Sequence, residues 1–326
     1  MKINNKTIFF LFALISFLII LFPNGLSGQV IHSSQRYNYV INKEVQEKHM
    51  TFFTSYQTGG RSVASKGNLD CRNYICAEFE KYGLLPLSAK GYVQEFHLPK
   101  YSGKGGNVIG YIPAKTKRAK YIVVGAHFDN IGLIGEKLYP GADDNASGVT
   151  ALLQIAQAYG KKFSECGGGK FNIVFVAFDA NNMSMLGSRT FVQKSGIAPS
   201  EIECMINLDQ MGSNLVPPGK NKEYLLVLGA NKLGNWNRSA LEFANTTFGL
   251  NLDIDHTYYN STQFYNIFYR LSDQQSFTEI GVPALLFTSG ITDHTNKETD
   301  DLSNVSFEVL DKRIRLIYQF LWLIMQ

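Results

Sequence analysis

Seven short apolar or alternating stretches, each bounded by Gly, Pro or Asn, follow one another after residue 90. This pattern predicts β-strands, because strands are short and turn residues end them. Two stretches, Tyr121–Ala126 and Ile173–Phe178, are apolar at almost every position, which indicates strands that are buried on both faces. The predicted strands are Tyr92–Leu98, Asn107–Ile112, Tyr121–Ala126, Phe171–Phe178, Met205–Leu208, Tyr224–Leu228 and Ala284–Thr288.

Helical patterns lie before and between these strands. The clearest are Val149–Tyr159, with apolar residues three and four positions apart, and Val305–Met325 at the end of the chain. The polar segment Gln29–Tyr56 and a second segment from Cys71 to Tyr82 also read as helices. Buried strands that alternate with helices predict an α/β protein, a three-layer α/β/α sandwich around a mixed, mostly parallel sheet.

The first residues have the pattern of a secretory signal peptide. Lys2 and Lys6 precede an apolar run, Ile8–Phe22, and small and polar residues follow it. The run is shorter than the about 20 residues that span a bilayer comfortably. We therefore predict cleavage after residue 27 or 28, export to the periplasm or the extracellular medium, no stable membrane insertion, and a single domain at residues 29–326.

Composition and charge fit a folded, exported protein. The 45% hydrophobic content of the 326 residues supplies a large core, and the formal charge of +4 falls to +2 without Lys2 and Lys6. Such a small charge does not predict nucleic-acid binding. The densest basic run, residues 115–120, reads as a solvated turn between two strands.

Four cysteines in an exported chain can form up to two disulfides. Cys166 and Cys204 are the more plausible pair, because each lies just before a predicted strand. Cys71 and Cys76 are five positions apart on a helical pattern and would point to different faces. Buried thiols are the alternative interpretation, and both stay open.

Ligand-type side chains follow several predicted strands. In open α/β sheets, ligands bind at the carboxyl ends of strands. His127 ends a strand, and Asp129 could accept the second ring N–H of a metal-bound imidazole. Asp144 lies in GADDNASG before a helix, where a carboxylate could bridge two cations. Asp209 in NLDQMGS ends another strand, and His294 lies in the loop TDHTNKETDDLSNV.

The order His, Asp, a doublet, Asp, His resembles that of the bacterial secreted two-zinc aminopeptidases, peptidase family twenty-eight. The doublet is Asn181 and Asn182 in FVAFDANNMSMLGS. The segments GRSVASKGNLDCRNYICAEFEKYGLLPL and RLSDQQSFTEIGVPALLF also resemble parts of that family, so the resemblance covers most of the mature chain. It implies the zinc-aminopeptidase fold and a peptide as substrate or ligand.

The resemblance also implies roles for single residues. His127 and Asp209 would bind a first zinc, Asp144 would bridge both zincs, and His294 would bind the second. Asp129 would orient His127.

The doublet departs from the family, which has two glutamates at this place: a general base and a ligand of the second zinc. An amide is a poor proton acceptor, and losing a general base typically costs about 100-fold to 10,000-fold in rate. Asp144 and Asp209 carry only two negative charges, which suit one divalent cation. We expect one zinc site, and a second site of Asp144, His294 and Asn182 that is empty or weakly held.

Two further carboxylates could replace the missing base. They are Asp179, two residues before the doublet, and Glu298, on the loop of His294. A structural hydrogen bond is the favoured interpretation of Asp179. The aromatic stretch Tyr258–Arg270 could line a pocket or pack its rings onto the core.

Three functions follow from these residues. The first is a zinc-dependent exopeptidase of the aminopeptidase type with weakened catalysis. The second is a non-catalytic protein that binds a peptide or a partner. The third is a glutaminyl cyclase, which resembles this fold with a single zinc but keeps a ligand glutamate that is absent here.

Overall fold

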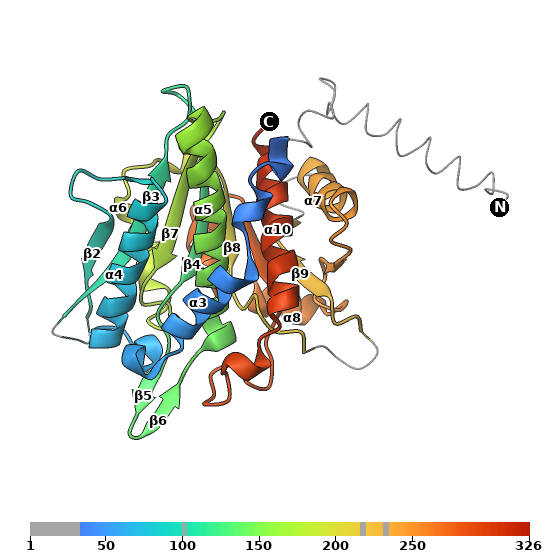
Figure 1. Cartoon of the computed structure of the whole chain (residues 1–326). Coiled ribbons are helices and arrows are strands. Elements are labelled where there is room, and N and C mark those ends of the chain that lie inside the picture. The colour runs from blue at the N-terminus through green and yellow to red at the C-terminus, as the bar shows by residue number, and fades with distance from the viewer. Residues whose placement is uncertain (1–32, 100, 102, 216–219, 231–234) are drawn as a thin grey trace. The chain divides into compact units, whose positions relative to one another are not determined.

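The computed structural model describes residues 33–99, 101, 103–215, 220–230 and 235–326 (Figure 1). From Val40 onward they form one compact unit, and residues 33–39 are grouped apart from it. The predicted signal peptide, residues 1–28, lies outside the described residues, so its cleavage stays a prediction. None of the described helices combines the length and the hydropathy that a membrane-spanning segment requires.

A nine-stranded mixed sheet forms the centre of this unit. The strand order is β1-β3-β7-β4-β8-β11-β9-β10, and β2 pairs with β3. The strands are β1 (Leu85–Pro86), β2 (Val93–His97), β3 (Lys104–Ile112), β4 (Tyr121–His127), β7 (Asn172–Phe178), β8 (Ile202–Leu208), β9 (Tyr224–Leu228), β10 (Asp253–Asp255) and β11 (Ala284–Thr288).

The four central strands, β7, β4, β8 and β11, run parallel. Antiparallel pairings join β3 to β7 on one side and β9 to β11 on the other, and β10 is parallel to β9. The predicted mixed sheet is therefore confirmed, with its parallel part concentrated at the centre. Register brings His127 on β4 opposite Phe178 on β7, so both strands end at the same edge.

Helices cover both faces of the sheet, which confirms the three-layer architecture (Figure 1). On one face α5 packs across the central strands, with α3, α4, α7 and α10 around it. On the other face α6, α8 and α9 contribute Phe191, Phe268 and Phe277 to apolar clusters against the sheet. The helices are α3 (Lys43–Phe53), α4 (Lys66–Lys81), α5 (Gly148–Cys166), α6 (Leu186–Lys194), α7 (Asn235–Thr247), α8 (Thr262–Phe268), α9 (Gln274–Thr278) and α10 (Phe307–Ile324).

All seven predicted strands are present, with ends that differ by a few residues. The first predicted helix, Gln29–Tyr56, is interrupted: residues 33–35 are helical, and α3 begins only at Lys43. The Asn42 side chain caps α3 by accepting a hydrogen bond from the Val45 N–H. Several short elements are also present. They are the hairpin β5 (Gly132–Ile134) and β6 (Lys137–Tyr139), the irregular turn η3 (Ala142–Ser147), and the 3₁₀ turns Asn38–Val40, Tyr56–Arg61, Pro199–Glu201 and Leu302–Asn304.

The structure contains no disulfide among the four cysteines, all of which are described. The predicted pair Cys166–Cys204 is therefore wrong. Cys204 is buried within β8, beside Ile122 of the neighbouring strand, whereas Cys166 is exposed at the end of α5. Burial raises the pKa of Cys71 and of Cys204 to about 12, so both are protonated, unreactive thiols at neutral pH.

Candidate metal centre

Three ligand-type side chains converge where the central strands end. His127 is the last residue of β4, and Asp209 follows the last residue of β8. Asp144 lies in η3, the turn that leads into α5. Parallel strands bring their carboxyl ends to one edge of a sheet, so residues 82 positions apart in the chain become neighbours here.

The geometry of the three side chains suits one cation. His127 Nε2 lies 3.4 Å from Asp144 Oδ1 and 3.5 Å from Asp209 Oδ1. One ligand atom from each residue lies within 4.8 Å of the others. Asp209 Oδ1 is buried and has no hydrogen-bond partner among the described residues, as expected of an oxygen reserved for a metal. One imidazole and two carboxylates, with room for a further ligand, form the donor set of a catalytic zinc site.

The two carboxylates change the pKa of the His127 imidazole. Burial by itself would lower the pKa of His127, but the nearby carboxylates of Asp144 and Asp209 raise that pKa well above its usual value. The surroundings of the imidazole therefore favour positive charge.

Asp129 lies beside the His127 ring, but its backbone carbonyl is nearer to the ring than its carboxylate. The His127 Nδ1 lies 3.1 Å from the backbone carbonyl oxygen of Asp129 and 3.8 Å from its carboxylate. The carbonyl, rather than the carboxylate, is therefore placed to orient the ring. The carboxylate instead accepts hydrogen bonds from the backbone N–H groups of Asn181 and Asn182, at 2.9 and 3.3 Å. Burial raises the pKa of Asp129 to about 7, although the His127 charge opposes this rise.

The doublet lies beside the three converging side chains and lines the same cavity. Asn181 Nδ2 donates a hydrogen bond of 3.0 Å to Asp273 Oδ2, and Asp273 is fully buried. This bond fixes the amide, because only the nitrogen can donate to a carboxylate. Oδ1 is the atom that Asn181 can then present to the cavity.

Backbone contacts hold η3 in place. The Asp300 carboxylate accepts from the N–H groups of Asp143 and Asp144, at 2.8 and 3.0 Å. Asn145 Nδ2 donates to the carbonyls that end β4 and β8, those of His127 and Leu208. These bonds tie the turn that carries Asp144 to the two strands that carry the other ligand-type residues.

Close packing at the start of α5 depends on glycine. A Cβ on Gly148 would lie 2.2 Å from Asn145 Oδ1 and 2.4 Å from the Leu208 carbonyl oxygen. Both contacts are shorter than van der Waals separation allows. The glycine of the GADDNASG motif therefore lets α5 start directly against β8.

His294 is not part of the converging group. It is partly exposed, and its Nδ1 lies 2.9 Å from Thr299 Oγ1 on the same loop. Asp179 and Glu298, the two carboxylates considered as replacement bases, form contacts away from the three converging side chains. Asp179 accepts from the N–H groups of Gly106 and Ala180 and from the Asn68 amide, a structural set of bonds, and exposed Glu298 pairs with Lys137 at 2.8 Å.

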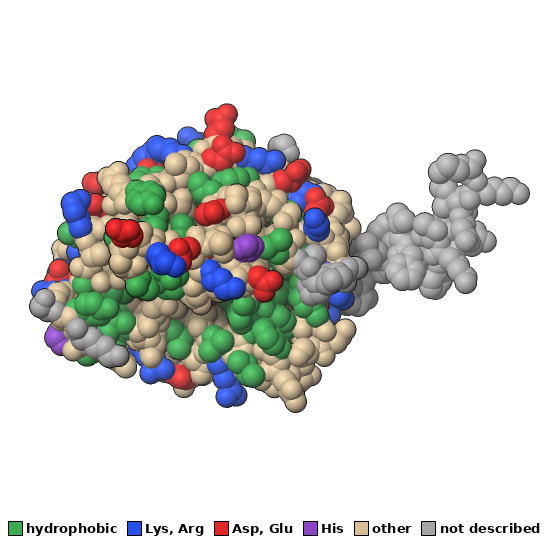
Figure 2. Space-filling model, turned by 90° about the horizontal axis from the view of Figure 1, so that it is seen from below, with side chains coloured by type: hydrophobic (Ala, Val, Ile, Leu, Met, Phe, Trp, Pro, Cys, Tyr) green, Lys and Arg blue, Asp and Glu red, His purple; other side chains and the backbone are tan. Residues whose placement is uncertain are grey.

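The cavity beside the converging residues has a volume of about 180 Å³. Phe268, Leu271 and Ile291 give it an apolar wall. The aromatic stretch thus packs onto the core and also lines the cavity through one ring. Figure 2 shows the end of the molecule that carries the β5–β6 hairpin, where apolar side chains gather in patches. Two of the residues that line the cavity, Leu271 and Ile291, are large, apolar and exposed.

Sequence reasoning missed Arg61, Asp273 and Asp300. These three buried residues form hydrogen bonds with the segments that carry the site. Arg61 and Asp273 stand in the two segments that resemble the family, GRSVASKGNLDCRNYICAEFEKYGLLPL and RLSDQQSFTEIGVPALLF, and Asp300 lies on the loop of His294. Nothing local distinguishes any of the three from a surface charge.

The amino-acid sequence of the chain matches the sequence model of a known protein family. The sequence model of Peptidase family M28 matches residues 107–321, about two thirds of the chain. The match contains His127, Asp144, Asn181, Asn182 and Asp209.

Related sequences are called leucine aminopeptidase 1. The protein of Paracoccidioides brasiliensis is 26% identical over 175 residues, which is 53% of this chain and 44% of that protein. The protein of Emericella nidulans is 25% identical over 323 residues, 92% of this chain and 77% of that protein. The chain thus spans less than half of the first of these relatives and about three quarters of the second.

Solved structures share the fold. The Legionella pneumophila LapA aminopeptidase matches with a TM-score of 0.68 and 19% identity, over 90% of this chain and 75% of that one. The Porphyromonas gingivalis glutaminyl cyclase matches with a TM-score of 0.65 and 17% identity, over 86% of this chain and 98% of that one. The zinc aminopeptidase BSAP of Bacillus subtilis has a TM-score of 0.54 and 21% identity, over 69% of this chain and 51% of that one.

Proposed function

Because this chain belongs to Peptidase family M28, we propose that it is an exported, zinc-dependent protein of the aminopeptidase type with one competent metal site and weak peptidase activity. The observation that carries the proposal is the convergence of His127, Asp144 and Asp209 beside a doublet of uncharged amides. The ligand would be the N-terminal part of a peptide.

His127, Asp144 and Asp209 would hold the zinc. A bound zinc supplies Lewis acidity toward a carbonyl oxygen or a water molecule. The Asp129 carbonyl orients the imidazole, and Asp300 and Asn145 hold the turn of Asp144. These hydrogen bonds would hold the ligand side chains in position for one cation.

Asn181 stands where the resemblance expects a general base. Its amide nitrogen is committed to Asp273. Its oxygen can accept a hydrogen bond from water but cannot take up the proton, because a neutral amide is a very weak base. Binding and orientation of a peptide would survive, and the proton transfer would not.

Asn182 stands where the resemblance expects a ligand of a second zinc. A neutral amide oxygen and a histidine outside the converging group make a weak pair of ligands. The second site would therefore stay empty or be weakly held.

Restoring the doublet tests this proposal. We expect the natural protein to hold about one zinc per chain and to release leucine slowly from a leucyl chromogenic substrate. The double variant Asn181→Glu, Asn182→Glu should bind a second zinc and react about 100-fold to 10,000-fold faster, since it regains a base. Elemental analysis and steady-state rates measure both quantities.

A control for the added charge is Gln57→Glu, Gln193→Glu, in which both positions are exposed. It should leave zinc content and rate unchanged. Two zincs per chain in the natural protein, together with turnover equal to that of the double variant, would refute the proposal.

Two other functions give different results in the same assays. A peptide-binding protein without catalysis would bind peptides but gain no turnover from the restored doublet. A glutaminyl cyclase is suggested by the match that covers 98% of the Porphyromonas gingivalis enzyme. It would convert an N-terminal glutamine to pyroglutamate, which mass spectrometry detects as loss of ammonia.

A further inference from the structure

A second cavity lies at the opposite end of the sheet from the metal centre. It is formed by the loops that lead into β4 and β7 and by the last turns of α5 and α10, and its volume is about 470 Å³. The seven residues of β4 separate it from His127, a distance of about 20 Å along an extended strand. A ligand here would not touch the metal centre.

Three lysines line this cavity, and no acidic side chain does. They are Lys115, Lys162 and Lys170, and the wall also contains Tyr159 and Trp322. The neighbouring acids are already paired, Glu165 with Lys161 at 3.1 Å and Glu203 with Lys120 at 2.9 Å. Within the described residues, none of the three lysines of the cavity forms an ion pair with a side-chain carboxylate, so their ammonium groups can accept an anionic ligand.

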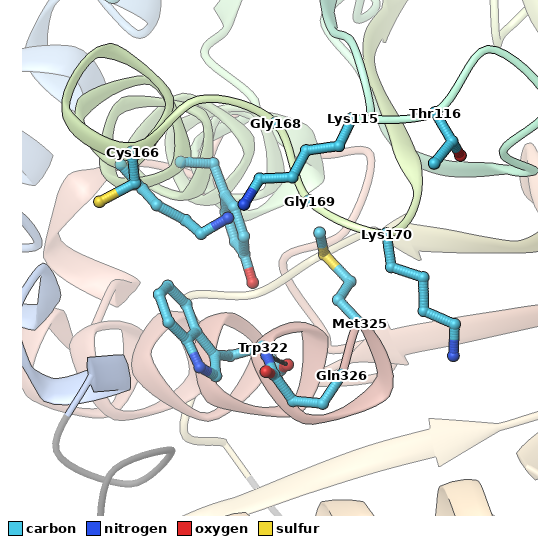
Figure 3. A pocket seen from close by; sticks show the side chains of 11 residues that line it. Lys115, Thr116, Cys166, Gly168, Gly169, Lys170, Trp322, Met325 and Gln326 are labelled. Atoms are coloured by element: carbon cyan, nitrogen blue, oxygen red, sulfur yellow. Dashed lines mark hydrogen bonds between the residues drawn. The ribbon is translucent and has the colours of Figure 1, made fainter.

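Lys162 is the most enclosed of the three lysines. Its Nζ lies 5.4 Å from the centre of the Trp322 ring, a cation–π contact. Burial lowers the pKa of Lys162; Cys166 opposes this shift, and repulsion from Lys115 adds to it. An anion between these two ammonium groups would remove that repulsion. Lys115 reaches into the cavity toward the side of Trp322, whereas Lys170 lies at the edge (Figure 3).

A backbone hydrogen bond and close packing hold the loops of the cavity wall together. The Lys115 N–H donates to the Gly169 carbonyl at 2.9 Å, which ties the two loops together. A Cβ on Gly168 would lie 2.0 Å from the Pro113 carbonyl oxygen, so only glycine permits this approach. The rest of the lining is mixed: Trp322 and Met325 are apolar, whereas Thr116 and Gln326 are polar.

We propose that this cavity binds a small organic anion, a carboxylate or a phosphate monoester that carries an apolar group. The ammonium groups of Lys115 and Lys162 would contact the acid group, and Trp322 and Met325 would contact the apolar group. The volume falls within the usual range of about 300–1,000 Å³ for small-molecule sites. The site is independent of the metal centre and of the proposed peptidase function.

Tryptophan fluorescence provides the test. Trp236 and Trp322 are the two tryptophans of the chain, so Trp322 is the only reporter in a Trp236→Phe background. Phenyl phosphate is the probe, with inorganic phosphate and phenol as its separate acid and apolar parts. We expect saturable binding of phenyl phosphate, and binding of each part that is about tenfold weaker or more.

Lysine variants locate the bound acid. Lys115→Gln and Lys162→Gln should each raise the Kd of phenyl phosphate about tenfold. Lys90→Gln, which removes the same charge from an exposed position away from the cavity, should not change it. Lys162→Arg keeps the charge and should retain binding, which guards against loss of packing around Trp322.

Three results would overturn the proposal. One is no saturable change with phenyl phosphate up to about ten millimolar. Another is an equal Kd in the Lys115, Lys162 and Lys90 variants. The last is equal affinity for phenyl phosphate and for one of its parts alone, since the site would then not select an apolar anion.

Discussion

Arg61 is a fully buried cation whose hydrogen-bond partners are backbone carbonyls. Its guanidinium donates to the carbonyl oxygens of Phe53, Phe128, Pro140 and Gly141, at 2.6 to 2.9 Å. One side chain thus connects the segment after β4 with the loop before η3. The planar fork of arginine suits several carbonyls at once, which a lysine could not serve.

Replacing Arg61 tests this connection. Arg61→Met should lower the free energy of unfolding by on the order of 3–5 kcal/mol, because buried carbonyls lose their donors. Chemical denaturation measures the change. Arg189→Met, at a surface pair with Glu279 at 3.9 Å, should cost less than about 1 kcal/mol. An equal loss in both variants would show that the buried carbonyls do not depend on Arg61.

At the scale of elements, helices α3 and α4 meet through a buried histidine. His49 on α3 lies 2.7 Å from the Tyr74 hydroxyl and 3.3 Å from that of Tyr82. Burial lowers the pKa of His49 from 6.5 to about 4, so the ring is neutral in the folded protein at neutral pH. The two hydroxyls suit a neutral ring, which has one donor and one acceptor nitrogen.

The lowered pKa of His49 predicts a loss of stability in acid. The unfolded chain binds the proton with a pKa near 6.5 and the folded chain only near 4, so stability is full above about pH 6.5 and falls as the pH drops toward 4. At about pH 4.5 the loss amounts to roughly 2–3 kcal/mol. Urea unfolding at about pH 7.5 and 4.5 should give a smaller difference for His49→Gln than for the natural protein. His97→Gln, at an exposed position on β2, should keep the natural difference.

At the scale of the whole molecule, metal binding and folding are coupled. The proposed ligands come from β4, η3 and the end of β8, so the complete site exists only in the folded chain. A cation that binds the folded state alone raises its stability by mass action, by about 4 kcal/mol at a thousandfold excess over Kd.

Thermal unfolding with and without Zn²⁺ checks this coupling. Zinc should raise the Tm of the natural protein, and a chelator should reverse the rise. Asp209→Asn should reduce the zinc-dependent rise strongly, because it removes a charged ligand. His294→Ala should retain the rise, since His294 lies outside the converging group. Loss of the rise in His294→Ala would contradict a single site of His127, Asp144 and Asp209.

The sequence by itself determined the strands and the ligand-type residues that end them. Continuous apolar runs such as Ile173–Phe178 can be satisfied only in a covered sheet, and turn residues mark their ends, so this information is local. His127 and Asp209 could be named because each stands beside such an end, and Asp144 because its motif GADDNASG precedes a helix.

Only the tertiary structure decided which groups act together. Arg61, Asp273 and Asp300 contact Phe128, Asn181 and Asp143, which lie 67, 92 and 157 positions away, and no local pattern encodes such partners. Cys166 and Cys204 looked alike in sequence, but one is exposed and the other lies inside the sheet. His294 stood in the expected order, yet its loop places it beside Thr299 and outside the converging group. Hydrogen-bond partners and distances depend on how distant segments pack, which chain order alone does not fix.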